Sequence, residues 1–289
     1  MPDPYTTCEY KNADNCSIKC DVYPSGKGVP VAVYIHGGAL INGSRNGIPG
    51  FCRNLYENEG YCLIAIDYRL APETKLPSII EDVAGALDWV RGVGAEAFGY
   101  NADRMAVTGN SAGGYLTLMT GTFKKKPRVL VPFYGYGDLL GDWLSKPNAH
   151  YCRWPLISCE DAQKGIKGFA VSEGGQFRDD FYFRTRQTAA WTSQVSGYDI
   201  VAERAKIEKY CPIFNITGDY PPTVLLHGDN DTDVPYEQSL DMYIALTSRG
   251  LTAELLTREN GGHGFDFDRG DPVVLEMEKR ATEFVKKHI

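Results

Sequence analysis

Short apolar runs alternate with longer segments of helical periodicity along most of this chain, and this alternation limits its fold more than any other feature. The apolar runs are continuous, which is typical of strands that are buried on both faces of a sheet. They lie at residues 18–23, 31–35, 62–67, 105–108, 129–133, 223–227 and 253–257. Strands that alternate with helices predict an α/β fold with a mostly parallel sheet covered by helices on both faces.

Three segments carry apolar residues at helical spacing. Residues 77–90 carry Ile80, Val83, Leu87 and Val90, and residues 237–248 carry Leu240, Tyr243, Ile244 and Thr247. The last helix is expected over residues 271–288, with Val274, Met277, Ala281, Phe284 and Val285 facing inward. The length of 289 residues suits one large α/β domain or two small ones, and it allows a sizeable core.

Residues 138–212 contain no clear strand, yet this segment is far too long for a simple loop. It holds Trp143, Trp154 and Trp191 together with several Tyr and Phe residues. A helical insertion that packs its own small core would explain these side chains. A cap over a pocket would also explain them, because open α/β sheets bind ligands at the carboxyl ends of their strands. We therefore expect one domain over residues 1–289 with a helical cap insertion at about 138–212.

The composition argues against nucleic-acid and membrane partners. The formal net charge is −7, which disfavours a nucleic-acid surface, and the basic run at 124–126 is interpreted as a solvated loop. The sequence contains no run of about 18 apolar residues, which is the length that a membrane-spanning helix needs. Residues 1–16 also lack the apolar segment of a signal peptide.

The cysteines and histidines do not match a metal site. Eight cysteines and five histidines lack the spacing of a zinc motif, so we expect neither a metal nor a cofactor. Cys20, Cys62 and Cys211 lie in or beside apolar runs, where free thiols behave as small hydrophobic side chains. Reduced thiols favour a cytoplasmic protein. A homodimer is left open.

The stretch AVTGNSAGGYL at 106–116 places Ser111 between Gly109 and Gly113, just after an apolar run and before an expected helix. This pattern fits either a plain tight turn or a reactive serine held on that turn. A serine hydroxyl becomes a good nucleophile only when a base accepts its proton and a third group orients that base. The interpretation therefore depends on a histidine and a carboxylate further along the chain.

His263 lies in the glycine-rich loop NGGHGFD, between the last expected strand and the last expected helix. The stretch HGDNDTDVP offers Asp229, Asp231 and Asp233 beyond the strand at 223–227, and turn formation could also explain each of them. The order Ser, Asp, His, with each residue after a strand, is the one expected on this scaffold.

The stretch VYIHGGAL at 33–40 ends an expected strand with small residues, so backbone N–H groups there could approach a tetrahedral oxyanion. An ordinary Gly-Gly turn would leave the same pattern. Because four such features follow matching strands, we favour the reactive serine.

The motifs HGG at 36–38, YRLAPE at 68–73, GNSAGG at 109–114, HGDNDTDVP at 227–235 and GGHGF at 261–265 resemble the hormone-sensitive-lipase-like branch of the α/β-hydrolase serine esterases. The resemblance runs from about residue 18 to the C-terminus and is weakest over 138–212. It implies an α/β-hydrolase fold with a catalytic triad and an oxyanion hole. The implied triad is Ser111 as nucleophile, His263 as base and Asp231 as acid, and the implied oxyanion donors are the N–H groups of Gly38, Ala39 and Ala112.

Two positions depart from the family pattern. Ala39 replaces a third glycine, which should be tolerated because only its N–H is used, and Asn110 replaces the usual Asp before the nucleophile. Other charged residues near these motifs are interpreted as structural, holding the loop under the active site. They are Asp67, Arg69, Glu73 and Asp82.

The resemblance implies a carboxylesterase that cleaves short-chain acyl esters of small molecules through an acyl-enzyme. Amide hydrolysis, by an aryl-formamidase or a peptidase of the prolyl-oligopeptidase type, is a first alternative. Acetyl-xylan or feruloyl esters, in which a sugar carries the acyl group, are a second. A non-catalytic binding module is disfavoured by the intact Ser, Asp and His.

Overall fold

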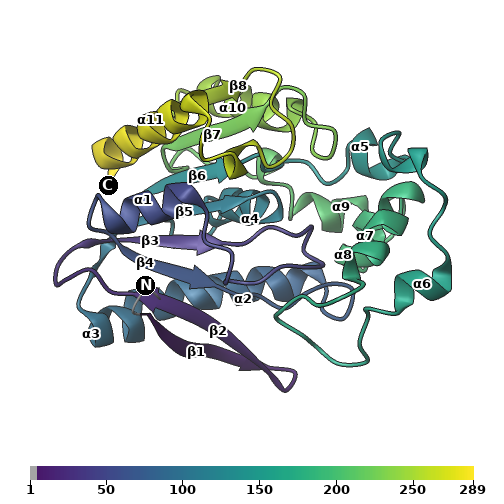
Figure 1. The fold of residues 1–289 in the computed structure, drawn as a ribbon, viewed down its shortest axis with the longest axis horizontal. Helices are drawn as coiled ribbons and strands as arrows, with labels where there is room; N and C mark the ends of the chain where they lie inside the picture. The colour runs from purple at the N-terminus through teal and green to yellow at the C-terminus, as the bar shows by residue number, and fades with distance from the viewer. Residues whose placement is uncertain (1–4) are drawn as a thin grey trace.

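Eight strands form one sheet across the middle of the molecule within residues 5–289, the part of the chain that this computed structural model describes (Figure 1). In sheet order they are β1 (Thr6–Ala13), β2 (Cys16–Tyr23), β4 (Cys62–Ile66), β3 (Pro30–Ile35), β5 (Asn101–Asn110), β6 (Val129–Phe133), β7 (Thr223–Gly228) and β8 (Ala253–Arg258). The pairs β1–β2 and β2–β4 are antiparallel, and all the later pairs are parallel. The predicted α/β architecture with a mostly parallel sheet is confirmed.

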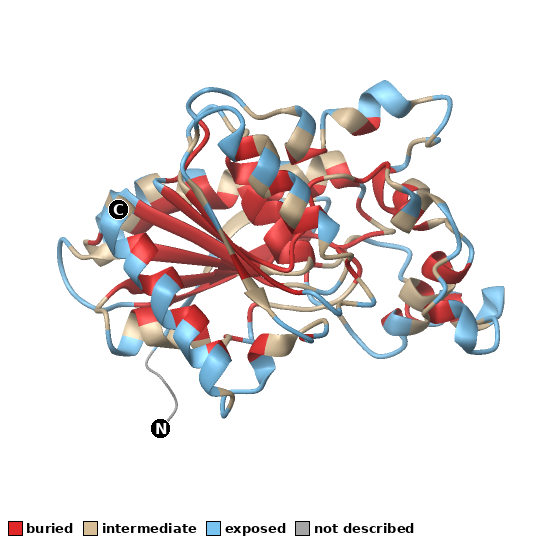
Figure 2. Ribbon diagram, turned by 90° about the horizontal axis from the view of Figure 1, so that it is seen from above, coloured by how far each residue is buried: buried red, intermediate tan, exposed pale blue. Residues whose placement is uncertain are grey.

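The middle strand β3 shows why the apolar runs are continuous. Val31, Val33 and Ile35 face one cluster of apolar side chains, whereas Ala32 and Tyr34 face a second cluster on the other side of the sheet. Successive residues of a strand point to opposite faces, so a strand with helices on both sides needs apolar residues at every position. Figure 2 shows buried strands at the centre and exposed residues on the outer sides of the helices.

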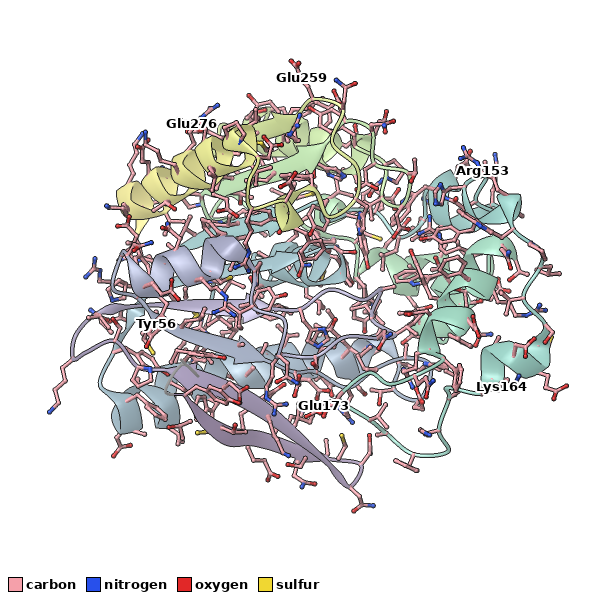
Figure 3. All side chains as sticks on the ribbon, viewed as in Figure 1. Tyr56, Arg153, Lys164, Glu173, Glu259 and Glu276 are labelled. Atoms are coloured by element: carbon pink, nitrogen blue, oxygen red, sulfur yellow. The ribbon has the colours of Figure 1, made fainter. Side chains whose placement is uncertain are left out.

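Helices cover both faces of the sheet. Helices α2 (Leu76–Trp89), α4 (Ala112–Thr120) and α10 (Glu237–Thr247) pack on the face that contains Val33, and α1 (Gly50–Glu57) and α11 (Pro272–His288) pack on the other. A π-helical turn, η1 (Val90–Gly94), and α3 (Ala95–Phe98) follow α2. In Figure 3 charged side chains such as Glu259 and Glu276 point outward from this part of the surface.

Strand β1 is not among the strands that the sequence predicts. Its residues, TTCEYKNA, contain no apolar run, and all eight are exposed or half-buried. An edge strand has a neighbour on one side only and is not covered on both faces, so its sequence is free to be polar. Strand β1 pairs with the buried strand β2 in a register that shifts between Glu9 and Lys11.

Helix α10 has the expected position but buries a different face. The apolar spacing of Leu240 and Ile244 predicts that these residues face inward, yet Ile244 is 52% exposed. The buried face instead carries Gln238, Met242 and Leu246. Gln238 is buried because its Oε1 accepts backbone hydrogen bonds from the loop after β6, at 3.0 and 3.2 Å. A polar residue whose hydrogen bonds are satisfied can occupy a buried face, and hydrophobic spacing does not reveal it.

The insertion (residues 138–212) consists of short helices beyond the carboxyl ends of the parallel strands, on the right in Figure 1. Its elements are α5 (Asp142–Ser145), η2 (Tyr151–Arg153), α6 (Cys159–Gln163), α7 (Arg178–Gln187), α8 (Trp191–Ser196), α9 (Arg204–Glu208) and η3 (Pro212–Phe214). The arrowheads of β3 and β4 point toward it (Figure 1). The insertion is therefore on the side where an open α/β sheet binds ligands.

The fully buried Arg178 holds the first turn of α7 against the sheet domain. Its guanidinium donates two hydrogen bonds of 2.8 Å to the carboxylate of Glu73. It also donates to the carbonyl oxygens of Ile41 and Ala71, at 2.5 and 2.7 Å. Removing one partner of a buried ion pair leaves an uncompensated charge, which is far more costly than the loss of an exposed pair.

We expect Arg178→Met to lower the free energy of unfolding by about 3–5 kcal/mol, because Glu73 would remain buried without its partner. Lys146→Met is the matched control, since Lys146 pairs with Asp142 on the exposed surface, and its cost should be about 0–1 kcal/mol. Urea denaturation followed by circular dichroism measures both values. Equal losses in the two variants would show that Arg178 does not anchor the insertion.

Candidate active site

Ser111 stands between the last residue of β5 and the first residue of α4. Its φ of 56° and ψ of −118° lie in a region that residues with a side chain rarely adopt. A Cβ at Gly113 would overlap the carbonyl oxygen of Ile35, and a Cβ at Gly109 would lie 2.6 Å from the same oxygen. The two glycines therefore permit the close approach of β3 that this sharp turn requires.

The side chains of Ser111, His263 and Asp231 form one hydrogen-bonded chain. Nε2 of His263 lies 3.0 Å from Oγ of Ser111, and Nδ1 of His263 lies 2.7 Å from Oδ2 of Asp231. His263 stands in the loop between β8 and η4 (Phe265–Phe267). These distances allow His263 to accept the serine proton while Asp231 orients the ring.

Of the three aspartates that the sequence leaves open, only Asp231 bonds to Nδ1 of His263. Its other oxygen, Oδ1, accepts the backbone N–H groups of Asp233 and Val234 at 2.8 and 2.9 Å, so the turn itself fixes the carboxylate. Asp229 is exposed and accepts the N–H of Asn260 at 2.6 Å. The three residues therefore have different structural environments.

The electrostatics of these three hydrogen-bonded side chains favour a charged aspartate and a basic histidine. Burial by itself raises the pKa of Asp231, but hydrogen bonds from His227 and His263 outweigh it and hold that pKa well below its usual range. Burial by itself lowers the pKa of His263, but the hydrogen bond to Asp231 and the nearby charge of Asp233 raise it above its usual value. An imidazolium would therefore be stabilised at His263.

His227 also belongs to the site, although no role for it is predicted from the sequence, where it begins the motif HGDNDTDVP. It is completely buried in β7, and its Nε2 donates to the carbonyl oxygen of Val234 at 3.1 Å and lies 3.3 Å from Oδ2 of Asp231. Its Nδ1 lies 2.7 Å from Oγ of Ser239 on α10. His227 therefore supports the turn that presents Asp231.

The loop after β3 places Gly38 and Ala39 beside the nucleophile. Both residues have positive φ, 102° and 58°, and both line a cavity that contains Ser111. A Cβ at Gly37 would lie 3.3 Å from the Cβ of Ser111, so a larger residue there would crowd the nucleophile. The N–H of Ala112 belongs to the first residue of α4, at the positive end of that helix.

His36, at the start of this loop, is held in place by its contacts with Tyr68. Its ring stacks on Tyr68 with centroids 4.3 Å apart, and the Tyr68 hydroxyl donates to the carbonyl oxygen of His36 at 3.0 Å. Burial lowers the pKa of His36 to about 4. His36 is therefore a neutral structural residue.

Two cavities meet at Ser111 and Ala39. The larger has a volume of about 290 Å³ and is lined by His263, Asp233 and Phe267 among others. The smaller has a volume of about 10 Å³, which is roughly the space of one water molecule. Of the two cavities, His263 lines only the larger. If Ser111 attacks an ester, the leaving group has to lie beside Nε2 of His263, which would put the acyl group in the smaller cavity.

The insertion supplies most of the walls of the smaller cavity. Trp143 and Trp191 line it, and Nε1 of Trp191 donates to the carbonyl oxygen of Ala39 at 3.1 Å. Trp154 does not line it and is 47% exposed. The structure thus separates three tryptophans that the sequence could not rank.

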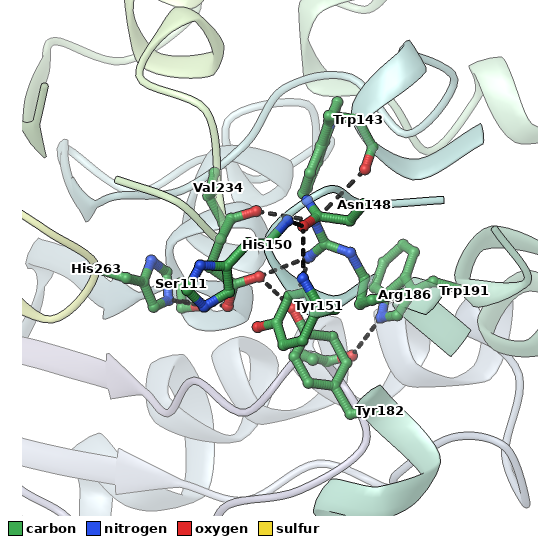
Figure 4. A network of polar contacts seen from close by, with 12 residues as sticks. Ser111, Trp143, Asn148, His150, Tyr151, Tyr182, Arg186, Trp191, Val234 and His263 are labelled. Carbon is green, nitrogen blue, oxygen red and sulfur yellow. Dashed lines mark hydrogen bonds and ion pairs between the residues drawn. The ribbon is translucent and has the colours of Figure 1, made fainter. Parts of the chain in front are cut away.

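Arg186 on α7 connects the insertion to the turn that carries Asp231 (Figure 4). It is buried, and its Nη1 donates to Oδ1 of Asp233 at 2.6 Å and to the Tyr182 hydroxyl at 2.7 Å. Its Nη2 donates to the carbonyl oxygen of Asp233 at 2.9 Å. The guanidinium also lies 5.2 Å from the ring centroids of both Trp143 and Tyr151. No sequence motif indicates this residue, because its partners are distant along the chain.

Asn110, which replaces the usual Asp, has a clear structural role. Its side chain accepts a hydrogen bond from the Tyr34 hydroxyl at 2.9 Å and donates to the Tyr134 hydroxyl at 3.4 Å. The Tyr134 hydroxyl in turn donates to Asp266 at 2.6 Å. Neutral hydrogen bonds to tyrosines therefore replace any ion pair at this position.

The charged residues interpreted as structural all make buried pairs. Arg69 binds Asp82 through Nε and Nη2 at 2.7 and 2.8 Å. Asp67 accepts the backbone N–H of Arg45 at 2.8 Å and also pairs with the guanidinium of Arg45. Arg69 also pairs with Asp14 in the β1–β2 turn, so these buried pairs join the segment after β4 to its neighbours.

Within residues 5–289, no group of three or more His, Cys, Asp or Glu side chains could hold a metal ion. None of the helices in that range is both long and apolar enough to cross a membrane. The reactive groups that the fold does bring together are the side chains of Ser111, His263 and Asp231, with backbone N–H groups beside them.

The model of the family described as BD-FAE matches residues 20–246, well over half of the chain. Among curated relatives, the chain is 27% identical to esterase LipC of Mycobacterium tuberculosis over 83% of this chain and 54% of that protein. It is 25% identical to the non-reducing polyketide synthase ausA of Emericella nidulans over 98% of this chain and 14% of that protein. The chain therefore spans about half the length of one relative and a small part of the other.

An α/β-hydrolase superfamily protein of Enterococcus faecalis superposes with a TM-score of 0.76 at 22% identity, covering 99% of both chains. This match confirms the predicted α/β-hydrolase fold. The likeness to esterase LipC agrees with the resemblance stated from the motifs.

We expect Asp233→Asn to lower the pKa of His263, because Oδ2 of Asp233 lies 3.7 Å from Nε2 and its charge stabilises the imidazolium. The positive charge of Arg186 opposes protonation of His263, and in this variant Arg186 would lose its partner. This second effect therefore also lowers the pKa of His263. An NMR titration of the imidazole C2 proton measures the pKa directly. Asp229→Asn is the control and should leave the titration unchanged. A higher pKa in Asp233→Asn would show that the charge of Asp233 does not stabilise the imidazolium.

Proposed function

Because the chain belongs to the BD-FAE family, we propose that it is a serine carboxylesterase that hydrolyses short-chain acyl esters. One observation carries this proposal: the hydrogen-bonded chain from Asp231 through His263 to Ser111, at the point where two cavities meet. The likeness to an esterase supports it. A simple binding module would not need a nucleophile, a base and an orienting carboxylate joined by hydrogen bonds, as they are here.

In the proposed mechanism, Oγ of Ser111 attacks the ester carbonyl while Nε2 of His263 accepts the hydroxyl proton. Asp231 stabilises the resulting imidazolium through Nδ1. The N–H groups of Gly38, Ala39 and Ala112 would bind the oxyanion, because they are small-residue backbone donors beside the nucleophile. His263 then gives the proton to the leaving alcohol. In the second half of the reaction water attacks the acyl-enzyme, His263 accepts a proton from this water, and His263 returns a proton to Oγ of Ser111 as the acid leaves.

We also propose that the protein works in the cytoplasm. All eight cysteines are unpaired thiols. Cys8 and Cys20 face each other across β1 and β2 without a disulfide. Paired cysteines that form no disulfide fit a reducing compartment, and fractionation of the cells tests this location directly.

We expect Ser111→Ala to reduce kcat on p-nitrophenyl acetate by about 10⁴–10⁶-fold, because the hydroxyl makes the covalent bond. Ser248→Ala, at an exposed position that ends α10, is the control and should keep full activity. Circular dichroism should show both variants folded, and an organophosphate should label the peptide that contains Ser111. A Ser111→Ala enzyme with a tenth of the wild-type activity would disprove the assignment.

We expect the acyl-chain optimum of kcat/KM on p-nitrophenyl esters to lie at acetyl or propionyl. Acyl groups longer than propionyl would overpack a cavity of about 10 Å³, at a cost of about 1–3 kcal/mol. Trp143→Ala should move the optimum to longer chains, whereas Trp154→Ala should not, because Trp154 does not line the cavity. An aryl-formamide and acetylated xylan assayed beside this panel test the amide and acyl-sugar alternatives. An unchanged profile in Trp143→Ala would place the specificity outside the insertion.

A further inference from the structure

Two buried polar atoms beside the nucleophile make no hydrogen bond within residues 5–289. They are the hydroxyl oxygen of Tyr136 and Nε of Arg186. Their side chains are 3% and 2% exposed. Both residues line the same small cavity as Ser111. Buried polar groups are almost always hydrogen-bonded, so two unpaired polar atoms on residues that line one cavity require an explanation.

The rest of the network does not use these two atoms. The terminal nitrogens of Arg186 already bind Asp233, Tyr182 and the carbonyl oxygen of Trp143, which leaves Nε outside the network of Figure 4. The ring of Tyr136 stacks on Tyr115 with centroids 4.9 Å apart. A phenylalanine would make the same ring contact, so packing does not explain the hydroxyl.

The cavity limits what these donors could bind. It has room for about one water-sized group, which is the size of a hydroxyl or a methyl. The charge of Arg186 is already balanced by Asp233 at 2.6 Å, so the site has no surplus positive charge for a carboxylate. One N–H donor and one O–H donor instead favour a neutral oxygen acceptor.

We propose that the acyl-side cavity recognises an acyl group with an oxygen on carbon 2, as in glycolyl esters. This inference rests on the proposed esterase function and adds a substrate class to it. The oxygen of the acyl group accepts hydrogen bonds from the Tyr136 hydroxyl and from Nε of Arg186. A plain alkyl group of the same size would leave both donors buried and unpaired, and sites of this kind discriminate strongly against such analogues.

The reaction on such a substrate is an ordinary ester hydrolysis. Methyl glycolate and water give glycolic acid and methanol. Oγ of Ser111 forms the acyl bond as the bond to methanol breaks, and the serine proton passes through His263 to the methanol oxygen. Water then cleaves the glycolyl ester of Ser111 and restores its proton. Tyr136 and Arg186 take no part in these bond changes, so they act as specificity-determining residues.

The test compares methyl glycolate with methyl propionate, which differ by a hydroxyl in place of a methyl. The value of kcat/KM for each ester is divided by its hydroxide-catalysed rate constant, because the two carbonyls differ in intrinsic reactivity. We expect the wild-type protein to prefer glycolate by at least about tenfold. Tyr136→Phe should reduce this preference by about 3–10-fold. Its melting temperature should not fall, because the lost hydroxyl has no partner within residues 5–289.

Tyr220→Phe is the matched control, since its buried hydroxyl donates to the carbonyl oxygen of Leu118 at 2.6 Å and does not line the cavity. It should lose stability and keep the glycolate preference. A wild-type preference near one, or an equal preference in wild type and Tyr136→Phe, would overturn the proposal. Failure of the proposed function is distinguishable, because the wild-type protein would then also fail to hydrolyse p-nitrophenyl acetate.

Discussion

The close contact between the end of β3 and the first turn of α4 determines the rest of the site. At Gly113 the two backbones leave no space for a Cβ beside the carbonyl oxygen of Ile35. At Gly37 a Cβ would lie 2.8 Å from the carbonyl oxygen of Asn110. Because the strand end and the helix start touch, Gly38 and Ala39, which follow β3, line the same cavity as Ser111. Any larger residue at these positions would push the loop after β3 away from Ser111, and with it the N–H groups proposed to bind the oxyanion.

Two arginines of helix α7 extend this arrangement into the insertion. Arg178 binds the loop after β3 through the carbonyl oxygen of Ile41, and Arg186 binds the turn of the triad acid through Asp233. They stand about two helical turns apart on one rigid element. One helix therefore contacts both the oxyanion loop and the acid turn. The size of the acyl cavity and the position of Asp231 are consequently linked through α7.

Much of the fold could be predicted from the sequence, because strands buried on both faces require continuous apolar runs. The exceptions have physical causes. Strand β1 is an edge strand and needs no such run, and α10 buries Gln238 because hydrogen bonds satisfy its amide. Periodicity also could not decide among Asp229, Asp231 and Asp233, since all three follow the same strand. Only the direction of each side chain, which the turn sets, separates them.

The sequence by itself was enough to propose the reacting groups. A serine between glycines after a strand and a histidine in a glycine-rich loop are local patterns, and local sterics dictate them. The tertiary structure alone decided which groups surround the substrate. Tyr136 and Arg186 are far apart along the chain, carry no motif, and meet only because the insertion folds back over the strand ends. The proposed recognition of the acyl group depends on such distant contacts, so no short stretch of the chain indicates it.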